Sequence, residues 1–170
     1  MKKQTSFFFI LFPVLMLAGA SGCMKKQSFP DTPAISLLSF EMFYDTARVA
    51  RTGIMTISYQ DGNGDIGLSP GDTFSPFQPK GPYYYNYVIN VFEKENGVFT
   101  PLVLAFPLSL RIPVLTPDDP NKAISGYIVD TIPLYPPPPH DTLKFEAFLY
   151  DRALNKSNVI TTPEIILRRK

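Results

Sequence analysis

The segment Ile54-Met55-Thr56-Ile57-Ser58-Tyr59-Gln60 determines the fold class, because from Met55 onward apolar and polar side chains alternate along it. A period of two is the pattern of a β-strand that buries one face. We therefore predict that Met55, Ile57 and Tyr59 face a core, while the polar side chains between them face solvent. A sheet of this kind is typical of antiparallel β proteins.

The rest of the chain repeats this signature in short segments separated by turns. Eighteen prolines and ten glycines, together with many aromatic and β-branched residues, argue against helices and for strands. Further strands are predicted at residues 35–44, 83–94, 98–115, 123–132, 143–150 and 159–167. Asn96-Gly97 predicts a tight hairpin turn. The prolines within 98–115 place that strand at an edge or at a change of sheet.

Seven strands at this spacing predict an all-β fold, a single immunoglobulin-like antiparallel β-sandwich over residues 34–170. The first strand is expected to place Leu38, Phe40, Met42 and Tyr44 on one face. In such a sandwich the loops after the second and the sixth strand emerge at the same end. The long loop after Gln60 should therefore lie beside a second polar loop, which contains Arg152, Asn155, Ser157 and Asn158.

The N-terminus carries the features of a bacterial export signal. Two lysines precede an apolar run at residues 7–20, which is short for a membrane span. Small residues then stand directly before Cys23, the only cysteine in the chain. This pattern resembles the bacterial lipobox, which implies cleavage after residue 22 and lipid attachment to Cys23. The alternative is an ordinary secreted protein with a buried cysteine.

These features predict three parts: a signal peptide at 1–22, a lipid anchor and tether at 23–33, and the sandwich at 34–170. The expected location is the bacterial cell envelope, at the outer membrane, with the lipid as the contact to the bilayer. Without the signal peptide, which holds two of the 16 basic residues and none of the 15 acidic ones, 14 basic residues face 15 acidic ones. No basic stripe is present, which argues against nucleic acid as a partner.

Asp61-Gly62-Asn63-Gly64-Asp65-Ile66-Gly67 places oxygen-bearing side chains at alternate positions between glycines. Ca²⁺ binds six to eight such oxygens. The predicted ligands are Asp61, Asn63, Asp65, the Gly67 carbonyl and Asp72, with Asp151 of the neighbouring loop as a further ligand. The loop departs from an EF-hand because Ile66 stands where the sharp-turn glycine belongs. The alternative is a glycine-rich turn in which Asp and Asn only cap backbone amides.

The glycine-aspartate run, Arg111-Ile112-Pro113 and residues 151–158 together resemble a family of uncharacterised lipoproteins from bacterial envelopes. The resemblance implies an immunoglobulin-like or fibronectin-III-like sandwich behind a lipid anchor. It implies no activity.

The sequence favours a non-enzymatic binding or structural module whose partner is an envelope protein or a glycan. One alternative is an accessory carbohydrate-binding lipoprotein of a nutrient-uptake system, which would use the rings of Tyr83, Tyr84, Tyr85 and Tyr87. Another is a hydrolase that uses Asp118 and Asp119 or the loop acids. No zinc-ligand set or phosphate-binding loop is found in the sequence.

Overall fold

The computed structural model describes residues 28–45, 50–115, 122–134 and 138–167. The predicted signal peptide, Cys23, Asp118 and Asp119 lie outside these ranges. The described residues form eight strands and no helix, so none of these residues forms a helix that could span a membrane. The strands are β1 (Ala34–Tyr44), β2 (Ala50–Asp61), β3 (Tyr87–Glu95), β4 (Val98–Pro101), β5 (Ile124–Pro133), β6 (Thr142–Leu149), β7 (Ile160–Thr161) and β8 (Ile165–Ile166).

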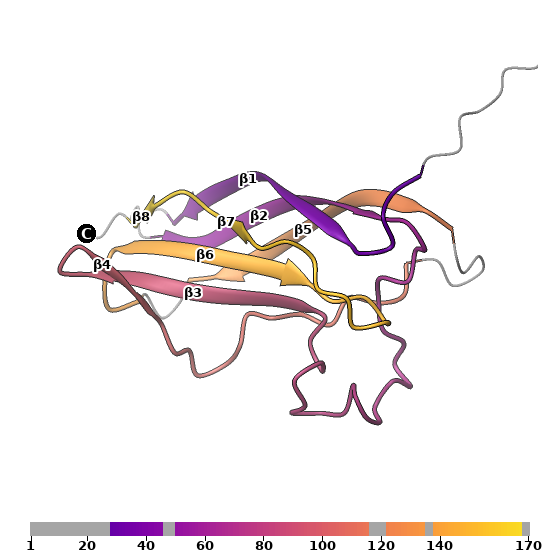
Figure 1. Cartoon of the computed structure of the whole chain (residues 1–170). Coiled ribbons are helices and arrows are strands. Elements are labelled where there is room, and N and C mark those ends of the chain that lie inside the picture. Colours follow the sequence, from indigo (N-terminus) through magenta and orange to yellow (C-terminus); the bar gives the residue numbers. More distant parts are fainter. Residues whose placement is uncertain (1–27, 46–49, 116–121, 135–137, 168–170) are drawn as a thin grey trace, which may run out of the picture.

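The strands form two antiparallel sheets that pack as a sandwich (Figure 1). One sheet has the order β1-β2-β5, and the other has the order β4-β3-β6-β7, with β8 also paired to β6. In immunoglobulin lettering these sheets are A-B-E and C′-C-F-G. The predicted fold class is therefore confirmed.

The core lies between the sheets and is built from the alternating side chains of their central strands. Met55 and Ile57 of β2 are buried, as predicted, and Tyr59 packs against the same core. In β6 the alternate residues Leu143, Phe145, Ala147 and Leu149 are all at most 1% exposed. In the described part of the chain every residue of this core lies between Ile35 and Leu167, so residues 24–170 contain this core.

The predicted face of the first strand is wrong at two positions. A register shift between Leu37 and Ser39 marks a bulge in the pairing of β1 with β2. Because a bulge reverses the alternation that follows it, Leu37 and Phe40 pack against the core while Leu38 is 52% exposed. Tyr44, which follows a second shift, is also exposed.

Three predicted boundaries also differ from the structure. The strand predicted at 83–94 begins only at Tyr87, and the strand predicted at 98–115 ends at Pro101. The strand predicted at 159–167 is divided into β7 and β8 by Pro163, which cannot donate a ladder hydrogen bond. The predicted turn at Asn96-Gly97 is confirmed, since both residues have positive φ, 50° and 83°.

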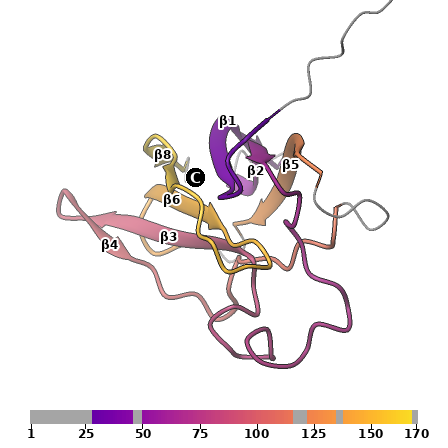
Figure 2. The same cartoon turned by 45° about the vertical axis from the view of Figure 1, so that its right-hand side comes forward.

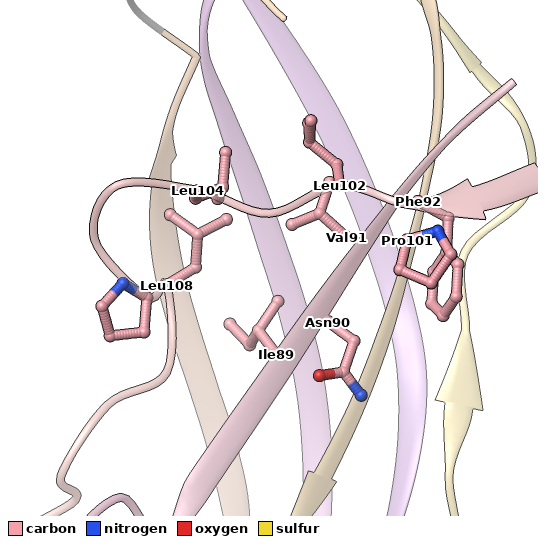
Figure 3. A pocket seen from close by; sticks show the side chains of 9 residues that line it. Ile89, Asn90, Val91, Phe92, Pro101, Leu102, Leu104 and Leu108 are labelled. Atoms are coloured by element: carbon pink, nitrogen blue, oxygen red, sulfur yellow. The ribbon is translucent and has the colours of Figure 1, made fainter. Parts of the chain in front are cut away.

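Residues 102–110, here called the crossing segment, leave β4 and follow the open side of the sandwich. Leu102 N donates to Val91 O at 2.8 Å, and Tyr87 and Leu110 exchange two backbone hydrogen bonds. Figure 3 shows Leu102, Leu104 and Leu108 of this segment around a cavity of about 460 Å³ beside β3. The crossing segment therefore closes part of the gap between β3 and β5.

Phe145→Ala should lower the free energy of unfolding by about 3–5 kcal/mol, because it leaves a cavity at a side chain that is 1% exposed and stacks on Phe40. Urea denaturation of residues 24–170 measures this loss. The control Val129→Ala changes a side chain that is 65% exposed and should cost at most about 0.5 kcal/mol. Equal costs for the two variants would contradict the described core.

Candidate metal centre

The candidate site lies where β2 ends and the long loop to β3 begins. Asp61 is the last residue of β2, pairs with Ile124 of β5, and is 0% exposed. The loop then turns sharply at glycines: Gly64 has φ +69°, and a Cβ there would lie 2.1 Å from the carbonyl oxygen of Lys122. Gly67 has φ +118° and packs in the same way against Pro113. Only glycine fits both positions, so the backbone stays close to its neighbours.

The loop after β6 contacts this turn directly. Ile66 and Asp151 form an isolated antiparallel bridge, and Arg152 N donates to Asp65 O at 3.2 Å. Both views of the fold place the segments after β2 and after β6 at the same end of the sandwich (Figures 1 and 2). The predicted proximity of the two loops is therefore correct.

Three carboxyl groups, Asp61, Asp65 and Asp151, come together here and are called the acidic cluster. Both carboxylate oxygens of Asp61 and Oδ1 of Asp65 are buried without a well-aligned hydrogen-bond partner, and the backbone amides near them only partly offset the effect of burial. Asp151 is 1% exposed and accepts hydrogen bonds from Asn155, from the backbone amide at 2.7 Å and from Nδ2 at 2.8 Å. A buried acceptor without a partner is costly, so the first two side chains need a ligand or a proton.

The electrostatics of the cluster agree with this need. The pKa of Asp61 is raised from 3.8 to about 6, by burial first and then by the charges of Asp65 and Asp151, and the backbone amides of Asp65 and Ile66 limit this rise. The pKa of Asp65 is raised by burial and then by Asp151, and the backbone amides of Ala153 and Asp65, followed by the charge of Arg152, offset part of this rise. Three acids that repel one another at a buried position favour a cation among them.

Asp72 does not join the cluster, contrary to the EF-hand alignment. Residues 69–72 form a turn in which Asp72 N donates to Ser69 O at 3.1 Å. The Asp72 carboxylate accepts a hydrogen bond from Ser69 N at 2.7 Å and forms an ion pair with Arg152. Hydrogen bonding to Arg152 lowers the pKa of Asp72, so this acid already has its counterion.

The other predicted site residues support the backbone. Asn63 Oδ1 lies 3.4 Å from the amide nitrogen of Asp65, which fits the alternative role of an amide cap. Ser157 Oγ accepts from Leu149 N at 2.9 Å, and the Asn158 side chain forms two hydrogen bonds with the backbone of Ile35. These residues position the loop after β6 and leave Asp151 as its member of the cluster.

Arg111 is an organising residue that the sequence pattern indicated only through a resemblance. Its guanidinium donates to three backbone carbonyls, those of Tyr84 at 3.0 Å, Ser69 at 3.0 Å and Asp72 at 2.6 Å. It also lies 5.2 Å from the centre of the Tyr84 ring. One further sign of its importance is visible in the sequence: Arg111 is a single charged residue after the uncharged segment 96–110. Arg111 thus ties both ends of the long loop together.

Among the described residues, no three His, Cys, Asp or Glu side chains are already arranged as a metal-binding group. The acidic cluster would therefore have to contract around an ion, with backbone carbonyls and water completing the shell. Carboxylate and carbonyl oxygens suit a hard cation such as Ca²⁺. The unpartnered oxygens of Asp61 and Asp65 are the part of the structure that fits this role.

The metal-free domain should lose stability as the pH rises from about 4 to 6, because Asp61 binds its proton more tightly when folded, with a pKa of about 6 against 3.8. The wild type should lose roughly 2–3 kcal/mol of unfolding free energy over this pH range, and Asp61→Asn should not show this loss. Urea denaturation at pH 4, 5, 6 and 7 measures both profiles. Asp72→Asn should instead lower stability by nearly the same amount at pH 5, 6 and 7, since the pKa of Asp72 is lowered and its stabilising charge is fully present above the unfolded value of 3.8. An unchanged profile in Asp61→Asn would contradict the charge assignment.

Comparisons of the chain with known protein families, with curated proteins and with solved structures found no match. The function is therefore argued from the geometry and charge of the described residues and from the sequence.

Proposed function

We propose that this chain is a lipid-anchored domain of the bacterial cell envelope, with a structural Ca²⁺ bound by the acidic cluster. It acts as a non-enzymatic binding or structural module. The observation that carries the metal assignment is a set of three buried, unpartnered carboxylate oxygens, two on the buried Asp61 and one on the partly buried Asp65, beside Asp151.

The ion would bind the loop after β2 to the loop after β6, in addition to the Ile66–Asp151 bridge. Its ligands are the side chains of Asp61, Asp65 and Asp151, supplemented by carbonyl oxygens of the same loops. Binding joins two segments about 90 residues apart in the chain, so it stabilises the end of the sandwich from which both loops emerge. Such a rigid loop surface is suited to contact an envelope protein or a glycan.

The anchor rests on the sequence before the described residues. Small residues followed by Cys23 after an apolar run supply the signal for cleavage and acylation. Stable attachment then requires no membrane-spanning element, because several acyl chains hold a protein at a bilayer. The outer membrane is the membrane we propose.

The carbohydrate alternative receives no separate support from the tyrosines. Tyr87 is fully buried, and Tyr83 packs edge to face on Tyr150 with ring centres 5.1 Å apart. Tyr84 and Tyr85 are partly buried and pack on each other. Sugar-binding rings need an open face, so we retain the binding module without a sugar assignment.

Calcium should raise the melting temperature of residues 24–170 in a saturable way, because an ion that binds only the folded state stabilises it. Extracellular sites have Kd values of about 10⁻⁴–10⁻³ M, so 10 mM Ca²⁺ should add about 1.4–2.7 kcal/mol. Differential scanning calorimetry with and without Ca²⁺ measures the gain, with Mg²⁺ as the comparison ion.

Two matched variants locate the ion. Asp65→Ala should abolish the calcium gain, whereas Asp72→Ala should keep it, because Asp72 is paired with Arg152 outside the cluster. Loss of the gain in both variants would support the EF-hand alignment instead. If Asp65→Ala kept the calcium-dependent rise in melting temperature, the acidic cluster would be ruled out as the calcium site.

Cys23→Ala should abolish lipid attachment when the full chain is expressed in a bacterium that processes lipoproteins. Metabolic labelling with an alkyne fatty acid, followed by detergent phase separation, measures the incorporation. The wild type should label and partition with the detergent, while the variant should remain in the aqueous phase. Labelling of both proteins, or of neither, would refute Cys23 as the anchor.

A further inference from the structure

A second buried acid lies far along the sandwich from the acidic cluster, where the crossing segment meets β5. A cavity of about 200 Å³ opens between them. Its walls are mostly hydrocarbon, and its lining residues are Pro107, Leu108, Leu110, Asp130, Thr131, Ile132 and Pro133. The other two cavities described beside the crossing segment have no ionisable side chain in their linings.

Asp130 is the charged group of this cavity. It shares the inward face of β5 with the buried Ile132, is 7% exposed, and its Oδ2 accepts no hydrogen bond. Burial raises its pKa, and the Thr131 amide offsets part of that rise. A carboxylate held here without a counterion is unfavourable, so a bound cation would stabilise it.

Tyr87 is the second polar group in this region. Its side chain is 0% exposed, and its hydroxyl has no hydrogen-bond partner. Burial, and then the charge of Asp130, raise the pKa of this hydroxyl. Its backbone is bonded to Leu110, a wall residue of the cavity. Asp130 Oδ2 therefore lines an apolar cavity without a hydrogen-bond partner, and the Tyr87 hydroxyl, which is not part of the lining, is a second unpartnered polar group in the same region.

We propose that this cavity binds a primary alkylammonium group, with the ammonium at Asp130 and the methylene chain along the apolar walls. An ammonium has three donors, one of which can satisfy Asp130 Oδ2 while its charge balances that of the carboxylate. Leu108, Leu110 and Ile132 cover the stem, as apolar surface does for lysine side chains. Asp130 would repel a ligand that carries a carboxylate, and an alcohol has no positive charge to balance that of Asp130. The group can belong to a free amine or to a lysine side chain.

Titration of ¹⁵N-labelled residues 24–170 with n-butylammonium, followed by NMR chemical shifts, tests the proposal. The chemical shifts should saturate with a Kd of about 1 mM, which corresponds to a binding free energy of about −4 kcal/mol. The largest shifts should occur at residues 108–110 and 130–133. n-Butanol and butyrate have the same stem with a neutral or an anionic head, and should bind at least tenfold more weakly. Equal response to butanol would overturn the ionic role of Asp130.

Asp130→Asn keeps the shape and removes the charge, so affinity for n-butylammonium should fall at least tenfold. The control Asp141→Asn, at an exposed position, should leave it unchanged. If Asp130→Asn does not fold, Leu110→Lys places a tethered ammonium at a 41% exposed wall position and should block binding, while Leu110→Met should not. Unchanged binding in Asp130→Asn or in Leu110→Lys would refute the site.

N-acetyl-lysine methylamide, titrated in the same way, distinguishes the two sources of the ammonium. Tighter binding than n-butylammonium indicates a lysine side chain of a protein or peptide, and weaker binding indicates a free amine. Failure of both amines to bind would refute the proposal and leave the calcium assignment untouched, because the acidic cluster involves none of these residues.

Discussion

Mutual repulsion among buried carboxyl groups is the constraint on which the loop end of this sandwich depends. Burial is the main cause that raises the pKa of Asp61 and of Asp65; the charges of Asp65 and Asp151 add to the rise at Asp61, and the charge of Asp151 adds to the rise at Asp65. Two arginines beside the group have partners outside it: Arg152 forms an ion pair with Asp72, while Arg111 donates to backbone carbonyls. The arginines hold the outer loop in place, and the acids are left facing one another, an arrangement that a divalent cation would relieve.

The two sheets make this arrangement possible by bringing distant residues together at fixed positions. Asp61 continues a strand that is paired on both sides, so its side chain cannot swing into water without breaking the ladder. Asp151 lies two residues after the end of β6, and its bridge with Ile66 connects the loop after β2 to the loop after β6. The position of Asp61 is therefore fixed by β2, while Asp65 and Asp151 lie in the loops that follow β2 and β6.

Asp130 illustrates a different consequence of the same topology. β5 is an edge strand of its sheet, and an inward-pointing charge on an edge strand discourages pairing with another chain. That role explains why an acid stands at this position. The cavity beside Asp130 would allow the same charge to bind the proposed alkylammonium group. The two sites differ in their surroundings. The acidic cluster places several acids together in polar loops, whereas Asp130 is a single acid in a cavity lined mostly by hydrocarbon.

The sequence by itself determined the fold class, because period-two alternation in β2 and β6 allows only one buried face, and the Asn96-Gly97 turn follows from its backbone requirement. It could not reveal the bulge after Leu37, since both possible faces of β1 are apolar enough to be buried. It named Asp61, Asp65 and Asp151 among the candidate ligands and also Asp72. Only the tertiary structure separated them, because regular spacing along a loop does not say where a carboxylate points. The turn at residues 69–72 directs Asp72 to Arg152, whereas the pairing of Ile66 with Asp151 brings an acid 90 positions away from Asp61 into the same cluster.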